Sequence, residues 1–181
     1  ANPGHIIITE FFFNPSTSDL PEYVELFNNT DSTIDLYEWK VDVDGKEFVI
    51  DGACDDGNPF EEVYTDEFAC TDADYVWKPF SINSNDYAVI LSSNGRLQSE
   101  DTTYCSPSYY DYSSFCNSPI DSLFWSLNTF SNSDLSNTSG TIKILDNSSA
   151  SNVIDSVAYD MAADFPVGED VLGGAAIFII D

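Results

Sequence analysis

Short runs of β-branched and aromatic residues, bounded by Asn, Asp, Gly, Ser and Pro, recur along the whole chain, and helical periodicity is hard to find. This pattern is typical of an all-β protein. The runs predict eight strands, at residues 5–12, 22–28, 33–43, 46–50, 87–92, 140–145, 152–159 and 175–180. Eight short strands in a chain of 181 residues indicate a single β-sandwich or barrel domain over residues 1–181.

One turn can be placed within this pattern. The string VDVDGKEF, residues 41–48, alternates apolar and polar side chains on both sides of Asp44 and Gly45. An Asp-Gly pair between two alternating strands is the preferred two-residue type I′ turn. The sequence therefore predicts a hairpin here. Cation binding by Asp42 and Asp44 is the alternative, but the hairpin explains these two carboxylates at least as well.

Two long connections interrupt the strand pattern, at residues 51–79 and 93–139. Connections of this length are uncommon in a compact domain unless they have a function or are held by a covalent link. We therefore expect both to be loop insertions in the domain, each held by a disulfide.

The four cysteines form two local pairs, Cys54 with Cys70 and Cys105 with Cys116, one pair in each insertion. Neither pair has the C-x-x-C spacing of a zinc site, and the only histidine is His5 near the N-terminus. We expect two disulfides, and pairing within each insertion closes the shortest loops. Disulfides place the protein in an oxidising compartment, so we expect it to be secreted, periplasmic or on a cell surface.

Charge narrows the range of partners. Five Lys and Arg residues against 32 Asp and Glu residues give a formal net charge of −27. Such a surface repels phosphate backbones and anionic lipids, so direct nucleic-acid binding is disfavoured. No run of 18 apolar residues is present that could span a membrane.

Three motifs in the first third of the chain are more specific than a general strand pattern. They are I-x-x-T-E-x-x-x-N-P at residues 6–15, E-Y-V-E-L-F-N at 22–28 and I-D-L-Y-E-W at 34–39. In this order and spacing they resemble the lamin tail domain family, as it occurs in bacterial secreted proteins. The later motifs that agree with the resemblance are F-S-I at 80–82, Y-A-V-I-L at 87–91, L-S-N-T-S-G-T-I-K-I-L at 135–145 and V-I-D-S-V-A-Y-D at 153–160.

The resemblance covers nearly the whole chain except the two insertions. It implies an immunoglobulin-like β-sandwich that serves as a non-catalytic interaction or accessory domain. The resemblance also implies that the domain is part of a larger, multidomain chain. A protein or a glycan is the expected kind of partner.

Glu10 and Glu25 are the candidate residues for catalysis. Paired carboxylates on neighbouring strands are what glycosidases use, so a hydrolase is an alternative function. In a family like this one, however, the two residues belong to a structural motif, and the sequence implies no convergent pocket around them. His5 has no Ser or Cys nucleophile near it in a recognisable arrangement. We therefore expect no enzymatic activity. We also expect Asn28, which ends the second motif, to hydrogen-bond the connection at residues 29–32.

The first insertion concentrates oxygen ligands. Ca²⁺ takes six to eight oxygens from loops of this composition, although the spacing D-x-x-x-D-D-x-N differs from an EF-hand. The alternative is a solvated acidic loop without a bound ion. No other cofactor is expected. The candidate Ca²⁺ ligands are Asp51, Asp55, Asp56 and Asn58.

The second insertion concentrates aromatic residues, among them Tyr109, Tyr110, Tyr112 and Trp125. Exposed, they could stack on sugar rings, which would make the domain a carbohydrate-binding module, or fill a pocket of a protein partner. The alternative is that they cover an edge of the sandwich. Trp39 and Trp77 adjoin predicted strands and are expected in the core.

Overall fold

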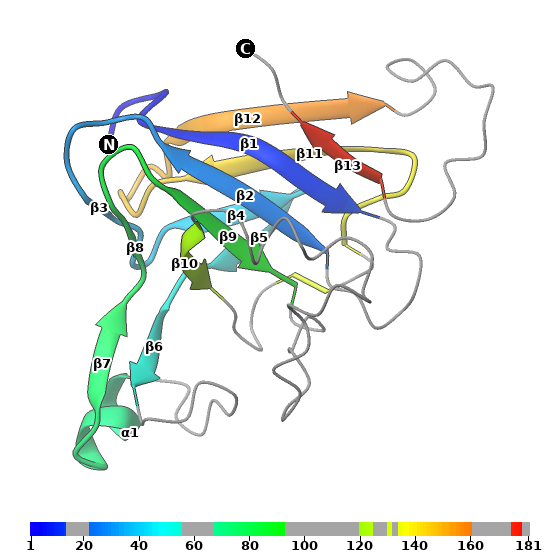
Figure 1. Cartoon of the computed structure of the whole chain (residues 1–181). Coiled ribbons are helices and arrows are strands. Elements are labelled where there is room, and N and C mark those ends of the chain that lie inside the picture. The colour runs from blue at the N-terminus through cyan, green and yellow to red at the C-terminus, as the bar shows by residue number, and fades with distance from the viewer. Residues whose placement is uncertain are drawn as a thin grey trace, which may run out of the picture.

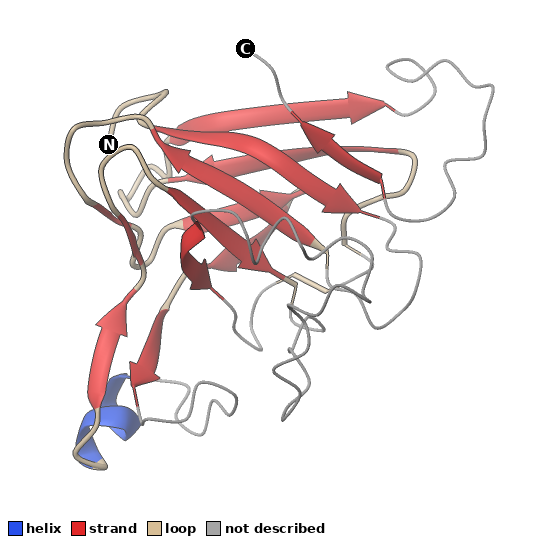
Figure 2. Cartoon of the chain, viewed as in Figure 1, coloured by secondary structure: helices blue, strands red, loops and turns tan. Residues whose placement is uncertain are grey.

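The computed structural model describes residues 1–13, 22–55, 67–92, 120–124, 130–131, 134–160 and 175–178. Strands dominate this part of the chain, and α1 (Glu67–Asp72) is the one helix that it contains (Figure 2). The all-β prediction is therefore confirmed. No helix among these residues is long and apolar enough to cross a membrane.

The larger sheet has five strands in the order β10-β9-β2-β1-β13 (Figure 1). Its pairs are antiparallel except for the pair of β10 with β9, which is parallel. The five strands are β1 (Ile6–Phe13), β2 (Tyr23–Asn28), β9 (Tyr87–Leu91), β10 (Ile120–Phe124) and β13 (Ala175–Phe178).

The second sheet has four antiparallel strands in the order β12-β11-β4-β5. They are β4 (Lys40–Val43), β5 (Lys46–Val49), β11 (Ser139–Leu145) and β12 (Val153–Asp160). The turn between β4 and β5 is the predicted one, because Asp44 and Gly45 both have positive φ, 51° and 86°, as a type I′ turn requires. Asp42 Oδ1 accepts a hydrogen bond of 2.9 Å from the Gly45 N–H, which confirms the structural role of this carboxylate.

The two sheets face each other across one apolar core, which is the arrangement of a β-sandwich and agrees with the immunoglobulin-like class. Ile6 and Ile8 of β1 point into this core, and so do Phe11 and Phe13. Before Thr9 the even-numbered residues of β1 face the core, and after it the odd-numbered residues do. The change is caused by a β-bulge at Thr9, where the register with β2 shifts. The bulge keeps the apolar side chains inside on both sides of Thr9.

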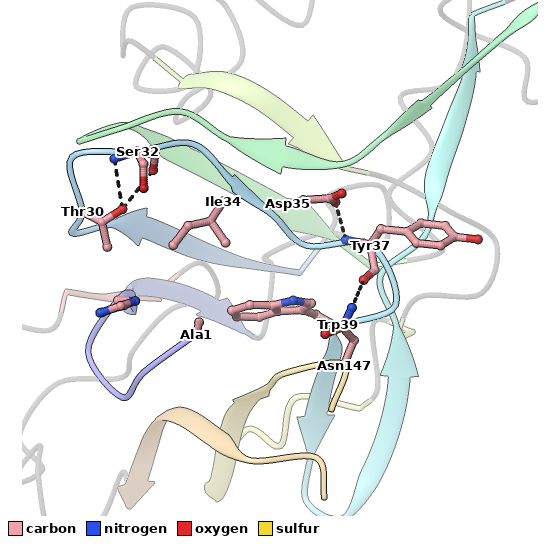
Figure 3. A pocket seen from close by; sticks show the side chains of 9 residues that line it. Ala1, Thr30, Ser32, Ile34, Asp35, Tyr37, Trp39 and Asn147 are labelled. Atoms are coloured by element: carbon pink, nitrogen blue, oxygen red, sulfur yellow. Dashed lines mark hydrogen bonds between the residues drawn. The ribbon is translucent and has the colours of Figure 1, made fainter. Parts of the chain in front are cut away.

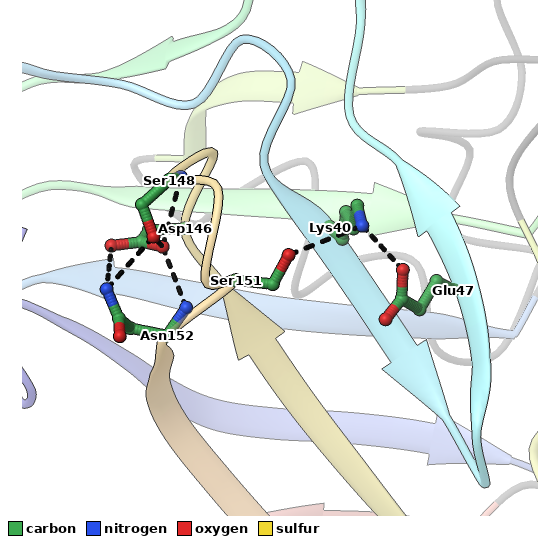
Figure 4. Close-up of polar contacts among 6 residues, drawn as sticks. All are labelled: Lys40, Glu47, Asp146, Ser148, Ser151 and Asn152. Carbon is green, nitrogen blue, oxygen red and sulfur yellow. Dashed lines mark hydrogen bonds and ion pairs between the residues drawn. The ribbon is translucent and has the colours of Figure 1, made fainter.

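The turn between β11 and β12 is held by the carboxylate of Asp146 (Figure 4). It accepts hydrogen bonds from Ser148 Oγ at 2.5 Å and from the Asn152 N–H at 2.9 Å. These donors lower the pKa of Asp146 to about 2. In the same turn Ser151 has a positive φ of 47°, and its hydroxyl accepts a hydrogen bond from Lys40 at 3.4 Å.

The prediction of one strand over residues 33–43 is wrong. The segment forms β3 (Ile34–Asp35) and β4, which belong to different sheets, because β3 pairs with β8 (Ser81–Ile82). The chain turns between them: Trp39 N–H donates to Leu36 O at 3.0 Å, and Glu38 has a φ of 62°. The turn moves the chain from one sheet to the other.

The first insertion is more regular than the predicted loop. Residues 52–55 and 67–79 form an arm that projects from the sandwich, with β6 (Gly52–Asp55) and β7 (Val76–Pro79) paired to each other and α1 at the tip (Figure 1). In the second insertion, predicted as a loop over 93–139, residues 120–124 form β10. Cys70 of α1 is buried and disulfide-bonded. The side chains of Cys54, Cys105 and Cys116 lie outside the described part, so the predicted pairing stays a prediction.

Candidate functional site

The bulge at Thr9 brings together Glu10 and Glu25, the two candidate residues for catalysis. Glu10 and Glu25 are direct cross-strand partners on the outer face of the larger sheet, an arrangement that places Cβ atoms about 5 Å apart. Each is held by a neighbour in the same sheet. Tyr23 OH donates to Glu10 Oε1, and Thr9 Oγ1 donates to Glu25 Oε1 at 2.7 Å. The pair is therefore part of the hydrogen bonding within the sheet.

Burial raises the pKa of both carboxyl groups. The Tyr23 hydrogen bond lowers the pKa of Glu10, and the charge of Glu25 raises it further. A second apolar cluster on the same outer face, formed by Phe12, Tyr23, Val89 and Leu91, explains the desolvation. A raised pKa in a carboxylate pair is compatible with acid catalysis, but burial beside this cluster accounts for it without a substrate.

Asn28 fills a structural role at the end of β2, where its side chain is fully buried. Its Oδ1 accepts from the Thr30 N–H at 3.1 Å, and its Nδ2 donates to Ser32 O at 2.8 Å. These bonds confirm the predicted contact with the connection at 29–32. Nδ2 also lies within hydrogen-bond distance of Ile82 O and Asn83 O, which ties β2 to the end of β8.

A cavity of about 460 Å³ opens at the end of the sandwich where β3 meets the turn between β11 and β12 (Figure 3). Its wall combines polar and apolar groups. Asp35 Oδ1 accepts from the Tyr37 N–H at 2.8 Å, and Asn147 Nδ2 donates to Tyr37 O at 3.2 Å. The lining residues are Ala1, His5, Thr30, Ser32, Ile34, Asp35, Tyr37, Trp39 and Asn147.

The side chains that line this cavity are mostly uncharged, and Asp35 contributes a carboxylate. His5 accepts a hydrogen bond at Nδ1 from the Asn2 N–H, at 3.3 Å, and is engaged with its own turn. Trp39 is buried in the main core, as predicted, so little of its ring faces the cavity. Within the described ranges, no three His, Cys, Asp or Glu side chains are grouped so that they could hold a metal ion.

Tyr37 lies between the cavity and the arm, a region that we call the junction. Its ring points away from Trp39 and Ile34 (Figure 3). Desolvation raises the pKa of the Tyr37 phenol, and nearby carboxylates raise it further. These carboxylates, which we call the acidic patch, come from three segments of the chain and are Asp35, Glu38, Asp51 and Glu67.

No described lysine side chain neutralises the acidic patch. Lys40, Lys46 and Lys143 are the lysines whose side chains the structure describes, and all three are paired elsewhere. Their partners are Glu47 at 2.6 Å, Asp134 at 2.5 Å and Asp42 at 3.7 Å, respectively. None of these three lysines therefore compensates the negative charge of the junction.

The arm exposes apolar side chains next to this patch. Phe68 of α1 is 77% exposed, Val76 at the start of β7 is 60% exposed, and Tyr75 between them is 40% exposed. Trp77 was predicted in the core; it is instead half-buried on the arm, outside the main core. The sequence predicts this insertion to be an acidic loop, with a Ca²⁺ site or simple solvation as its alternatives, and does not predict the arm. The signal that could have found it is the presence of large apolar residues in an otherwise acidic insertion.

Of the candidate Ca²⁺ ligands and ligand-contact aromatic residues, the structure describes the side chain of Asp51 alone. Asp51 lies just before β6, and its Oδ1 accepts a hydrogen bond of 2.9 Å from the Gly52 N–H. The side chain of Asp55, all of Asp56 and Asn58, and the aromatic residues Tyr109, Tyr110, Tyr112 and Trp125 lie outside the described residues. The Ca²⁺ site and the sugar-stacking surface therefore stay predictions.

Comparison with known proteins decides the family. The sequence profile of the family described as Lamin Tail Domain matches residues 1–160. This chain belongs to the lamin tail domain family. Of the strands in the described residues, the match includes β1 to β12, and β13 lies beyond it. A search of curated proteins finds no match.

Family membership agrees with a structural role for the carboxylate pair. Lamin tail domains are immunoglobulin-like interaction domains and not enzymes. In this lamin tail domain the motif residues Glu25 and Asn28 bind neighbouring strands and turns, which is what a structural motif requires. The exposed apolar side chains of the arm and the acidic patch at its base lie apart from these structural residues.

Proposed function

We propose that this lamin tail domain is a non-catalytic interaction domain of a secreted or cell-surface protein, with the arm as its contact surface. The observation that carries the proposal is the exposure of Phe68, Tyr75 and Val76 on an element that projects from the sandwich. Exposed apolar side chains that gather on one element, unlike those scattered singly, are typical of a binding surface. Family membership supports the same class of function.

The absence of catalysis is supported by the site itself. Glu10 and Glu25 are the best candidates for acid–base chemistry, and both are hydrogen-bonded within the sheet and desolvated beside an apolar cluster. The cavity lies at the other end of β2, next to the Asn28 turn. The carboxylate pair and the cavity therefore do not form one site.

The compartment is argued from cysteine chemistry. Cys70 is disulfide-bonded, and disulfides persist in oxidising compartments. We propose the pairing of Cys54 with Cys70, supported by the packing of α1 against β6, the strand that carries Cys54. The pairing of Cys105 with Cys116 rests on sequence alone. The high negative charge suits a chain that must stay soluble outside the cell.

The experiment compares binding with turnover. The full chain is tested for hydrolysis of polysaccharides, peptides, esters and phosphodiesters, alone and as Glu25→Gln, and for binding to immobilised peptides and polysaccharides. We expect no turnover, and binding that falls in Phe68→Ser but not in Val153→Ser, a matched exposed apolar residue on β12. Turnover that is lost in Glu25→Gln would contradict the proposal. Binding that is unchanged in Phe68→Ser would also contradict it.

A further inference from the structure

We propose that the arm docks a basic polypeptide segment that also carries apolar side chains. This inference rests on the proposed interaction function and adds the chemistry of the partner. It combines three features of the described residues: exposed apolar groups, unneutralised carboxylates around them, and an aromatic ring at the base of the arm.

The apolar part of the surface lies on α1 and the start of β7. Phe68 is the most exposed large apolar residue described, and its neighbours along the arm, Tyr75 and Val76, are exposed as well. The turn between them is ordered, because Tyr75 N–H donates to Cys70 O at 3.1 Å and Cys70 is fully buried. The arm thus presents its apolar side chains on a fixed backbone, which lowers the entropy lost on binding.

The carboxylates near Phe68 indicate the charge of the partner. Glu67 precedes Phe68, and Asp72 and Asp74 precede Tyr75, and all three carboxylates are on exposed residues. The lysines with described side chains are paired to carboxylates on the sandwich, so they do not neutralise this region. A partner that covers Phe68 must approach these carboxylates, and a cationic segment gains from that approach where an anionic one is repelled.

The base of the arm also combines an aromatic ring with carboxylates. The negative charges of the acidic patch act on the Tyr37 phenol, and an aromatic ring with carboxylates in its neighbourhood is a favourable place for a guanidinium or ammonium group.

Other occupants fit less well. A second copy of this chain brings another −27 formal charges, so self-association through the arm is opposed by repulsion. Nucleic acid and anionic lipid are opposed for the same reason. A neutral glycan could contact Tyr75 and Phe68 but would gain nothing from the carboxylates around them.

The test uses the full chain and three synthetic peptides of equal length. The first alternates Lys and Arg with Leu and Phe, the second replaces the apolar residues by Ser, and the third replaces the basic residues by Glu. Affinity is measured by fluorescence anisotropy in about 0.15 M NaCl, where long-range attraction to the net charge is screened. Because Phe68 is exposed, Phe68→Ser should leave the fold intact, which a thermal melt verifies.

We expect the basic and apolar peptide to bind, and Phe68→Ser to weaken it about tenfold, as loss of a central aromatic contact does. Glu67→Gln should weaken it less and mainly at low salt. Val153→Ser matches the loss of an exposed apolar group, and Asp31→Asn matches the loss of an exposed carboxylate; neither should change the affinity.

Two outcomes would overturn the inference. Equal binding of both basic peptides with no effect of Phe68→Ser would mean attraction to net charge alone, without a docking surface. Binding that depends on Phe68 but prefers the acidic peptide or a neutral polysaccharide would refute the partner chemistry, while the proposed interaction function would stand.

Discussion

The carboxylate of Asp155 on β12 accepts a hydrogen bond of 2.7 Å from the backbone N–H of Ile8 on β1, and so joins the two sheets of the sandwich. The bond lies beyond the pairing of β1 with β13 that the structure describes, which covers residues Glu10 to Phe13. A second link, from the Gly4 N–H to Ile154 O at 3.1 Å, adds to it. The side chain of Asp155 therefore satisfies a backbone donor of β1 outside this described pairing.

The first prediction concerns this link. Asp155→Ala removes the acceptor of the part-buried Ile8 N–H and should lower the free energy of unfolding by about 1–3 kcal/mol. Asp155→Asn keeps a side-chain oxygen and should lose less. Urea denaturation measures both. Equal stability of Asp155→Ala and the parent would show that water replaces the carboxylate without cost.

The second prediction concerns pH and the carboxylate pair. The pKa of Glu25 is raised above 4.5 in the folded chain, chiefly by burial, so the folded state binds more protons than the unfolded state between these two pKa values. The free energy of unfolding should therefore fall as pH rises through the folded pKa. Glu25→Gln keeps an acceptor for Thr9 and removes the charge, so it should be more stable than the parent at pH 7 and lose this advantage near pH 4.5.

Glu47→Gln is the control for this prediction, because Glu47 lies in an exposed ion pair with Lys40 and should gain no stability at pH 7. The measurement is urea denaturation at a series of pH values. A Glu25→Gln variant that is less stable than the parent at pH 7 would mean that the carboxylate is stabilised by its surroundings.

The third prediction concerns Asp146, whose effect on the free energy of unfolding changes with pH in the opposite direction. The pKa of Asp146 falls from 3.8 to about 2 in the folded chain, because Ser148 and Asn152 donate to its carboxylate. Its contribution to stability is present above pH 4 and is lost as pH falls toward 2. Asp146→Asn should flatten the acid limb of the stability curve in this window. An unchanged acid limb would mean that the turn carboxylate is not responsible for it.

Asn28 carries the fourth prediction. Asn28→Ala leaves the Thr30 N–H and the Ser32 carbonyl without their buried partner and should cost about 1–3 kcal/mol of unfolding free energy. Asn29→Ala removes one exposed hydrogen bond of 3.4 Å to Gly4 O and should cost much less. Guanidinium denaturation compares the two. Equal losses would argue against a special role for the buried amide.

The strands could be predicted where the pattern is local. Period-two alternation located β2, β5 and β11 to within a residue or two, and the Asp44-Gly45 pair located a turn that depends on two adjacent residues. The family motifs added the sandwich class, because their order along the chain reflects the order of the strands.

The parts that could not be predicted depend on contacts distant in sequence. The bulge at Thr9 exchanges the faces of β1, and nothing in the run IIITEFFF indicates which residue is extra. The break between β3 and β4 arises because β3 pairs with β8, which lies far along the chain. The pairing of β6 with β7 likewise joins two ends of an insertion, so the arm and its exposed Phe68 could not be located from local pattern alone.

Hydrogen–deuterium exchange of the full chain, with and without the basic and apolar peptide, tests most directly whether the arm is the contact surface. Binding at the arm predicts slower amide exchange in α1 and β7, and no change in β1, β2 and β9. Slower exchange around Glu10 and Glu25 with an unchanged arm would contradict it, and would return the carboxylate pair to consideration as the functional site.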